Sequence, residues 1–204
     1  MKLLITAATS DEINAIKKWI KAANIKKNLD IDYLCCWIGN YETILNLEHY
    51  ISKYSEPIFI RNIWICGYWN HDNQKKNIPI QAATTFNIHT EKEFVIPPFV
   101  QIAPMRNCFS SEKPIKEKPY LKKEIECIND EWYFDMESRW TEFVSLRHKL
   151  PHIILKVPLD FVWQETLDLY DNKWKFIWKD VADCLEKLPY HDYLQKIIEW
   201  IESQ

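Results

Sequence analysis

Two carboxylic acids, Glu137 and Asp160, each come shortly after a predicted strand, where a carboxyl group could exchange protons with a bound ligand. The first strand is the aromatic run 132–134, and the periodic segment 139–150 that follows it predicts a helix. A second apolar run, 152–157, has strand length and leads to Asp160. Because ligands bind beyond the carboxyl ends of the strands in an open parallel sheet, the order strand, acid, helix, strand, acid predicts that both side chains face one crevice.

A third acid, Glu12, lies near the start of the first predicted helix. Residues 2–8 predict a buried strand, and Thr9-Ser10-Asp11-Glu12 opens a helix that continues to about residue 24. The spacing of Thr9 and Glu12 matches a capping box, in which the glutamate accepts a hydrogen bond from the backbone N–H of the threonine. The residues alone therefore indicate a structural role for Glu12.

The composition describes an ordinary globular domain. A chain of 204 residues is expected to form one domain, residues 1–204, and to bury roughly 70% of its unfolded surface. The net charge of -3 leaves no basic surface for nucleic acid. Only two glycines are present, whereas an average usage of ~7% would give about fourteen. This shortage argues against glycine loops that hold a phosphate by close backbone approach.

Six cysteines lack the spacing of a zinc site or a redox motif, so we interpret them as reduced core thiols of a cytoplasmic protein. They are Cys35, Cys36, Cys66, Cys108, Cys127 and Cys184. No segment has the length of a signal peptide core or a membrane span, so we expect no membrane partner. His71 and Asp72 are adjacent in a polar segment, but no third ligand stands at a recognisable spacing, and we expect neither a metal nor a cofactor.

Strand and helix patterns alternate along most of the chain. Further strands are predicted at 31–38, 57–66 and 99–105, and a hairpin is predicted from 80–88 and 93–96. Further helices are predicted at 41–54, 119–128, 174–188 and 189–201. Such alternation is typical of the α/β class.

The segment Asp135-Met136-Glu137-Ser138, at a strand-to-helix boundary, resembles the Met-Glu motif of the purine and uridine phosphorylase superfamily. That superfamily includes the methylthioadenosine/adenosylhomocysteine nucleosidases and the futalosine hydrolases. The resemblance implies a three-layer phosphorylase/hydrolase-like α/β fold, with a central mixed, mostly parallel twisted sheet flanked by helices. It also implies that Met136 and Glu137 contact a ribose and that Asp160 is catalytic, although Leu159 stands where the family usually has serine.

The same resemblance implies roles for other residues. Glu12 would hold the attacking water, so it is either a helix cap or a water ligand. Cys66 and Gly67 correspond to a small-residue turn near water or phosphate, but Trp64 stands in place of that turn's first glycine, which disfavours phosphate. The implied base-binding residues, at the end of a strand, are Phe109, Ser110 and Ser111.

Three carboxyl groups placed in this way suit the cleavage of an N-glycosidic bond. The reaction builds positive charge on the sugar and negative charge on the departing base. A protonated Asp160 could donate to a ring nitrogen of the base, because burial raises the pKa of a carboxyl group. Glu137 could accept hydrogen bonds from the ribose hydroxyls and stabilise the cationic sugar. Glu12 could deprotonate the water.

Three functions follow from the resemblance. The first is a nucleosidase that cleaves a purine nucleoside with water. The second is a phosphate-dependent nucleoside phosphorylase, and the third is a catalytically degenerate protein that binds a nucleoside without cleaving it. The expected partner is a small-molecule nucleoside. A homodimer or higher homo-oligomer is also expected, because members of the family complete the site with a neighbour's side chain.

Overall fold

The computed structural model describes residues 2–22, 30–55, 58–70, 79–87, 92–95, 100–112, 131–162, 195–200 and 203. Eight strands and three named helices lie in these ranges. The strands are β1 (Lys2–Ala7), β2 (Asp30–Cys35), β3 (Ile58–Asn70), β4 (Ile80–Asn87), β5 (Lys92–Val95), β6 (Met105–Ser110), β7 (Glu131–Asp135) and β8 (His152–Phe161). The helices are α1 (Ser10–Ala22), α2 (Asn40–Ile51) and α4 (Ser138–Arg147), and residues 195–200 are also helical. The predicted helices 119–128 and 174–188 lie outside the described residues.

All eight strands belong to one sheet, in the order β2-β1-β3-β7-β6-β4-β5, with β8 paired to both β3 and β4. Five pairings among the described strands are parallel and three are antiparallel. The predicted hairpin is confirmed, because β4 and β5 pair in antiparallel orientation. The mixed α/β class is also confirmed.

The expected open, mostly parallel sheet needs correction, because part of it closes on itself. β3 pairs with β7 and β8, and β8 returns to β4, so β3, β7, β6, β4 and β8 form a ring that resembles a small barrel. The cause is strand length. β3 has 13 residues and β8 has 10, so each reaches beyond its first neighbour to a second one. A register shift between Cys66 and Gly67 marks an irregularity in the β3–β8 pairing.

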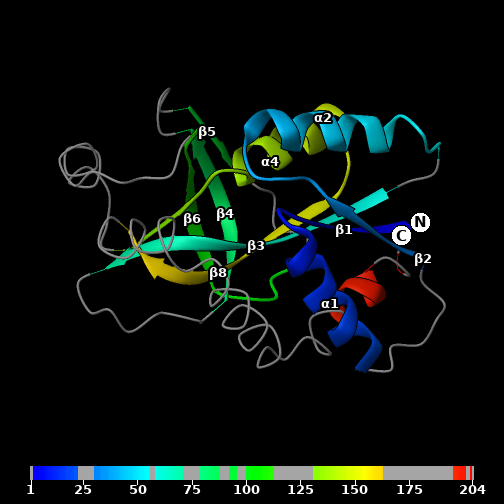
Figure 1. The fold of residues 1–204 in the computed structure, drawn as a ribbon, viewed down its shortest axis with the longest axis horizontal. Helices are drawn as coiled ribbons and strands as arrows, with labels where there is room; N and C mark the ends of the chain where they lie inside the picture. The colour runs from blue at the N-terminus through cyan, green and yellow to red at the C-terminus, as the bar shows by residue number, and fades with distance from the viewer. Residues whose placement is uncertain are drawn as a thin grey trace.

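Helices cover the β1–β3 region on both faces (Figure 1). Figure 1 shows α2 and α4 on one side and α1, with the helical segment 195–200, on the other. Successive residues of β1 alternate between the two sides, as strand geometry requires. Leu3 and Ile5 pack in a cluster with Ile13 and Ile16 of α1. Leu4 instead packs in a cluster with Leu47 of α2 and Val144 of α4. β1 therefore packs apolar side chains on both faces, as expected for a parallel strand covered by helices on both sides.

A buried ionisable pair joins α4 to β8. The Nε2 atom of His152 lies 2.5 Å from Oε2 of Glu142, and the two side chains are almost completely buried. Burial by itself would lower the pKa of His152, but the hydrogen bond to Glu142 and its charge outweigh burial, so the net shift is upward. The pair therefore stabilises the fold most when the imidazole is charged.

We expect Glu142→Ala to lower the free energy of unfolding by about 3–5 kcal/mol at pH 6, because it leaves a buried imidazolium without its partner. A raised folded-state pKa means that the His152 contribution is complete below pH 6.5 and is lost as the pH rises through the folded value. Urea denaturation of the wild type and of Glu142→Ala measures the two free energies of unfolding, which should differ more at pH 6 than at pH 9. Glu48→Ala is the matched control, since Glu48 pairs with His148 at a partly exposed position worth about 0–1 kcal/mol. Equal losses for the two variants would contradict the prediction.

Candidate active site

Glu12 serves as the helix cap that its spacing predicts. Its Oε2 atom accepts hydrogen bonds from the backbone N–H of Thr9 at 2.8 Å and from the Thr9 hydroxyl at 3.0 Å. The Oε1 atom accepts a longer bond, 3.4 Å, from the backbone N–H of Ile65 in β3. The residue is only 2% exposed. One carboxyl oxygen therefore caps α1, while the other faces the sheet, so the cap does not use the whole carboxyl group.

Glu137 lies at the corner between β7 and α4, where the sequence predicts a strand-to-helix boundary. Its Oε1 atom accepts a 3.2 Å hydrogen bond from the backbone N–H of Gly39, and Oε2 accepts one of 3.2 Å from Met136. Gly39 is the N-cap residue of α2 and has φ +112°, a conformation that side chains disfavour. The positive end of α2 therefore points at the Glu137 carboxylate.

Asp135 and Lys156 lie in the same buried region and form an ion pair. The Lys156 side chain is completely buried, and that of Asp135 is 2% exposed. Lys156 is also close enough to Glu12 and Glu137 for its charge to lower the pKa of each. No sequence motif marks this lysine. Its one signal is a charged residue within the apolar run 152–157.

The charges of these buried groups act on one another. Burial raises the pKa of Glu12. Burial, followed by the negative charges of Asp135 and Glu12, raises the pKa of Glu137 to about 8. Burial acts in the opposite direction on Lys156, but Asp135 and Glu137 outweigh it and raise the lysine's pKa overall. The cluster therefore keeps a charged lysine and can bind or release a proton near neutral pH.

The predicted base-binding residues lie at the end of β6, beside Asp135. The Ser110 hydroxyl donates to Oδ1 of Asp135 at 2.6 Å and accepts from the backbone N–H of Arg139 at 2.9 Å. The backbone N–H of Ser111 donates to the Asp135 carbonyl at 2.9 Å. Both residues thus connect β6 to the corner that carries Glu137. Their contact with a base stays a prediction.

Phe109 belongs to an aromatic cluster rather than to the polar part of the site. Its ring stacks on Phe86 with centroids 4.8 Å apart and an interplanar angle of 9°. Its centroid is also 4.7 Å from that of Trp132 and 5.6 Å from that of Phe134. Only 5% of the residue is exposed. These ring contacts are sufficient to explain why Phe109 is buried. Its role in base binding stays a prediction.

Cys66 and Gly67 lie inside β3, which continues to Asn70, so the expected turn at these residues is wrong. The chain stays extended because the end of β3 pairs with both β7 and β8. The irregularity at this point is the register shift between Cys66 and Gly67, after which Gly67 pairs with Asp160. The backbone of Asp160 therefore lies beside Gly67. The side chains of Asp160 and Trp64 are not among those that the structure describes.

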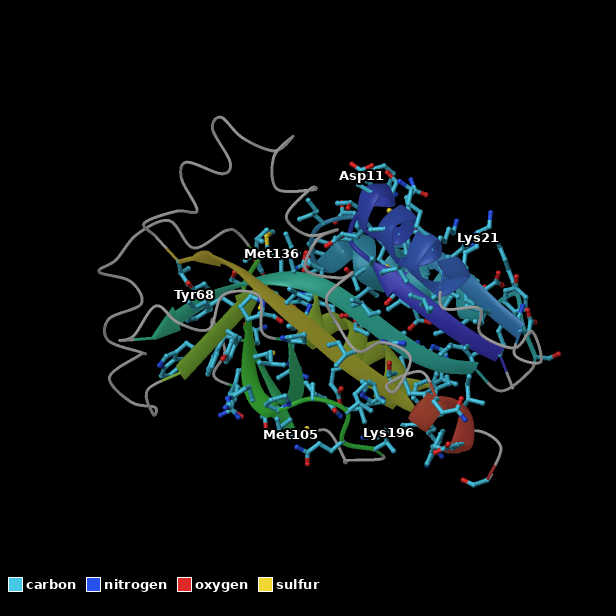
Figure 2. The ribbon with its side chains drawn as sticks, turned by 90° about the horizontal axis from the view of Figure 1, so that it is seen from below. Asp11, Lys21, Tyr68, Met105, Met136 and Lys196 are labelled. Atoms are coloured by element: carbon cyan, nitrogen blue, oxygen red, sulfur yellow. The ribbon has the colours of Figure 1, made fainter. Side chains whose placement is uncertain are left out.

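Met136 precedes Glu137 and is partly exposed. Figure 2 shows Met136 on the same side of the long strands as Asp11 at the start of α1, whereas Met105 and Lys196 lie on the other side. Together with the coupling between Glu12 and Glu137, this view agrees with a site between the start of α1 and the β7–α4 corner. The structure thus brings Glu12, Met136 and Glu137 into one region.

Within the described part of the chain, no three His, Cys, Asp or Glu side chains are grouped to hold a metal ion. His71 and Asp72 fall outside that part. Among the helices that the structure describes, none is both long and apolar enough to cross a bilayer. Cys35, Cys36, Cys66 and Cys108 are in the reduced thiol form, whereas Cys127 and Cys184 fall outside the described residues.

Comparison with known proteins gives a clear result only at the level of structure. No protein-family model matches the sequence, and no curated protein matches it. A solved structure from Borrelia burgdorferi B31, assigned as a 5'-methylthioadenosine/S-adenosylhomocysteine nucleosidase and bound to adenine, aligns with a TM-score of 0.71 and 16% identity. The alignment covers 90% of this chain and 96% of that one.

Two further nucleosidases of this kind agree. The Helicobacter pylori enzyme, solved with butyl-thio-DADMe-Immucillin-A, aligns with a TM-score of 0.70 and 13% identity, over 91% of this chain and 96% of that one. The Neisseria meningitidis enzyme, solved with methylthio-immucillin-A, gives a TM-score of 0.68 and 10% identity, over 92% and 99%. The TM-scores establish a shared fold, and identities this low establish nothing beyond the fold.

Proposed function

Given that the chain has the fold of the 5'-methylthioadenosine/S-adenosylhomocysteine nucleosidases, we propose that it hydrolyses the N-glycosidic bond of a purine nucleoside. The observation that carries the proposal is the buried cluster of Glu12, Glu137 and Lys156, in which the charges of the two acids and the lysine act on one another. Because the acids come from segments far apart in the chain, helix capping alone does not account for their meeting.

The ionisation of the cluster suits this reaction. Cleavage of the bond leaves positive charge on the ribose, which a carboxylate at Glu137 would stabilise. Since the pKa of Glu137 is raised to about 8, much of the free protein carries a proton there at pH 7, and ribose hydroxyls would favour the ionised form. The raised pKa of Glu12 favours its use as the base that takes a proton from water. Asp160 is the proposed acid that protonates the departing base.

Water is the proposed acceptor because the site is poorly suited to phosphate. Lys156 is already paired with Asp135, so an ionised Glu12 or Glu137 gives the cluster a net negative charge, which repels an anion. Neither glycine offers a phosphate loop, since Gly39 caps α2 and Gly67 lies within β3. Both features favour hydrolysis over phosphorolysis.

The nature of the base is proposed from the ligands of the neighbours. The Borrelia burgdorferi structure holds adenine, and the Neisseria meningitidis structure holds methylthio-immucillin-A. We therefore propose a purine nucleoside for this chain. Its cytoplasmic location and its organisation as a single domain are proposals that rest on the sequence alone.

Incubating the protein with a panel of purine and pyrimidine nucleosides, with and without phosphate, tests the proposal. Free base is quantified by chromatography. We expect release of a purine base without phosphate and no increase when phosphate is added. Release only with phosphate would favour the phosphorylase. A rise in melting temperature with nucleoside, but no release of base, would favour the degenerate binding protein. Either result would overturn the proposed hydrolysis.

A second copy of this chain is the proposed occupant of an apolar surface formed by the segment before α2 and the outer sides of α2 and α4. Large side chains are exposed there, including Trp37 at 61%, Tyr41 at 72% and Leu45 at 66%. Phe143 and Leu146 of α4 are also exposed. The surface is continuous with the site, because Gly39 lies between Trp37 and Tyr41 and donates a hydrogen bond to Glu137. A homodimer formed here would place each partner beside the other's site.

We expect the wild type to be a dimer and the double variant Tyr41→Ser/Leu45→Glu to be a monomer. A buried carboxylate without a partner would be costly at such an interface. Light scattering after size-exclusion chromatography measures the mass. Lys18→Glu, at an exposed position of α1 on the other side of the sheet (Figure 1), is the control and should leave the mass unchanged. A monomeric wild type would contradict the proposal.

A further inference from the structure

We propose that Asp135 and Lys156 form a positioning pair, which acts on the reaction through Glu137 and Glu12 and does not touch the nucleoside. This inference rests on the proposed function, since it assigns roles to further residues of the same site. It starts from the bonding of Asp135, the burial of Lys156 and the groups that surround Glu137.

Asp135 fixes the backbone corner that presents Met136 and Glu137. Its Oδ2 atom accepts a 3.0 Å hydrogen bond from the first backbone N–H of α4, at Ser138, and a bond from the Ser138 hydroxyl. Its Oδ1 atom accepts from Ser110 at the end of β6. Lys156 of β8 completes the set. One carboxylate thus connects β6, β7, α4 and β8, so a change at Asp135 is transmitted to the neighbouring Glu137.

Lys156 is an unusual residue for the centre of a sheet. A lysine is rarely buried without a partner, because its charge loses the stabilisation of water. A buried ion pair generally adds little stability compared with apolar side chains of the same size. Ile154, two residues before Lys156 and therefore on the same face of β8, packs in an apolar cluster, so an apolar side chain would suit this face of the strand. An ion pair whose lysine acts on two buried glutamates therefore indicates a role in the site rather than in stability.

The groups that face Glu137 come from four segments. Asp135 belongs to its own corner, Lys156 to β8 and Glu12 to α1. Cys36 lies in the segment before α2, from which Gly39 also donates its N–H. Lys156 is the only positive side chain among these described groups, and it is paired to Asp135. The two members of the pair act on Glu137 with opposite sign: Lys156 lowers its pKa, and Asp135 raises it.

Because Lys156 and Asp135 shift the pKa of Glu137 in opposite directions, replacing each of them distinguishes a role in the site from a purely structural one. Lys156→Met removes the positive charge, so it should raise the pKa of Glu137 by about one unit or more, a tenfold change in proton affinity. Asp135→Asn removes a negative charge and leaves Lys156 to Glu137 and Glu12, so it should lower the same pKa. A pair that served only stability would destabilise the fold in both variants without moving the Glu137 titration in opposite directions.

The experiment is a titration of the Glu137 carboxyl group by carbon-13 NMR, assigned with Glu137→Gln, in the full-length wild type and in both variants. Lys156→Arg, which keeps the charge, should restore the wild-type midpoint to within about half a unit. Lys156→Gln replaces Lys156→Met if the latter does not fold, and the lysine variants decide the outcome if Asp135→Asn does not fold. Shifts in the same direction, or no shift, would overturn the positioning pair.

The titration uses no nucleoside, which separates this inference from the proposed function. If the wild type releases base, the pH profile of kcat/KM should show an apparent pKa that shifts in each variant together with the midpoint of the Glu137 titration measured by NMR. An apparent pKa that is the same in the wild type and the variants would overturn the action of the pair on the reaction. If no nucleoside is cleaved, the proposed function fails while the opposite shifts still establish how the pair sets the charge of Glu137.

Discussion

Replacing Glu137 with glutamine is expected to lower kcat/KM for nucleoside cleavage by about 10²- to 10³-fold while the protein melts at the same or a higher temperature. The loss arises because a neutral amide cannot stabilise the cationic ribose as a carboxylate does. The folded state tolerates the change because burial and the charge of Asp135 disfavour the ionised form of Glu137. Base release measures the first effect, and thermal unfolding measures the second.

The pH dependence of stability has a definite sign. Glu137 has a folded-state pKa of about 8 against an ordinary value of 4.5, so the folded protein binds the proton more tightly than the unfolded chain. Its contribution is complete below pH 4.5 and is lost as the pH rises through 8. The melting temperature of the wild type should therefore fall relative to that of Glu137→Gln between pH 5 and pH 9. Glu48→Gln, at a partly exposed position, is the control. Unchanged turnover in Glu137→Gln would exclude the ribose role.

Glu12→Gln is expected to lower kcat by about 10²- to 10⁴-fold without a large loss of stability, because it removes the proposed base for the water. Glutamine can still accept the hydrogen bond from Thr9, as it does in capping boxes, so the cap is retained. Measurements of kcat and of the free energy of unfolding separate the two roles.

Thr9→Ala is the matched control for Glu12. It removes the hydroxyl that bonds to the Glu12 side chain and to its backbone N–H, and it should cost about 1 kcal/mol of stability. Its kcat should stay within a few-fold of the wild-type value. If Thr9→Ala reduces kcat as much as Glu12→Gln does, then Glu12 contributes through the helix start and not as a base.

Local patterns in the sequence were sufficient to locate two parts of the site. The aromatic run before Asp135 predicts a strand, and β7 ends at Asp135, with α4 beginning at Ser138. The Thr9–Glu12 spacing predicts a capping box, whose hydrogen bonds are present. Both depend on neighbours within four residues, so a short stretch of sequence contains the information.

Features that depend on distant partners could not be predicted in this way. Lys156 interrupts an apolar strand, and only the fold shows that Asp135 neutralises it. The strand predicted at 99–105 is also wrong, because β6 runs from Met105 to Ser110. The segment before β6 is instead bound by the side chain of Gln81, which accepts a hydrogen bond from the Ile102 N–H and donates one to the Val100 carbonyl. Closure of the sheet through β3 and β8 likewise depends on long-range pairing.

A crystal structure with a C-nucleoside, whose base is joined by a carbon–carbon bond that cannot be hydrolysed, tests most directly whether the acids meet around one sugar. We expect a ribose hydroxyl within roughly 2.6–3.2 Å of the Glu137 carboxylate, and a water on Oε1 of Glu12 facing the anomeric carbon. The Asp160 carboxyl should lie against the base. A nucleoside bound away from Glu12 and Glu137, or a ribose with no contact to either, would contradict the account.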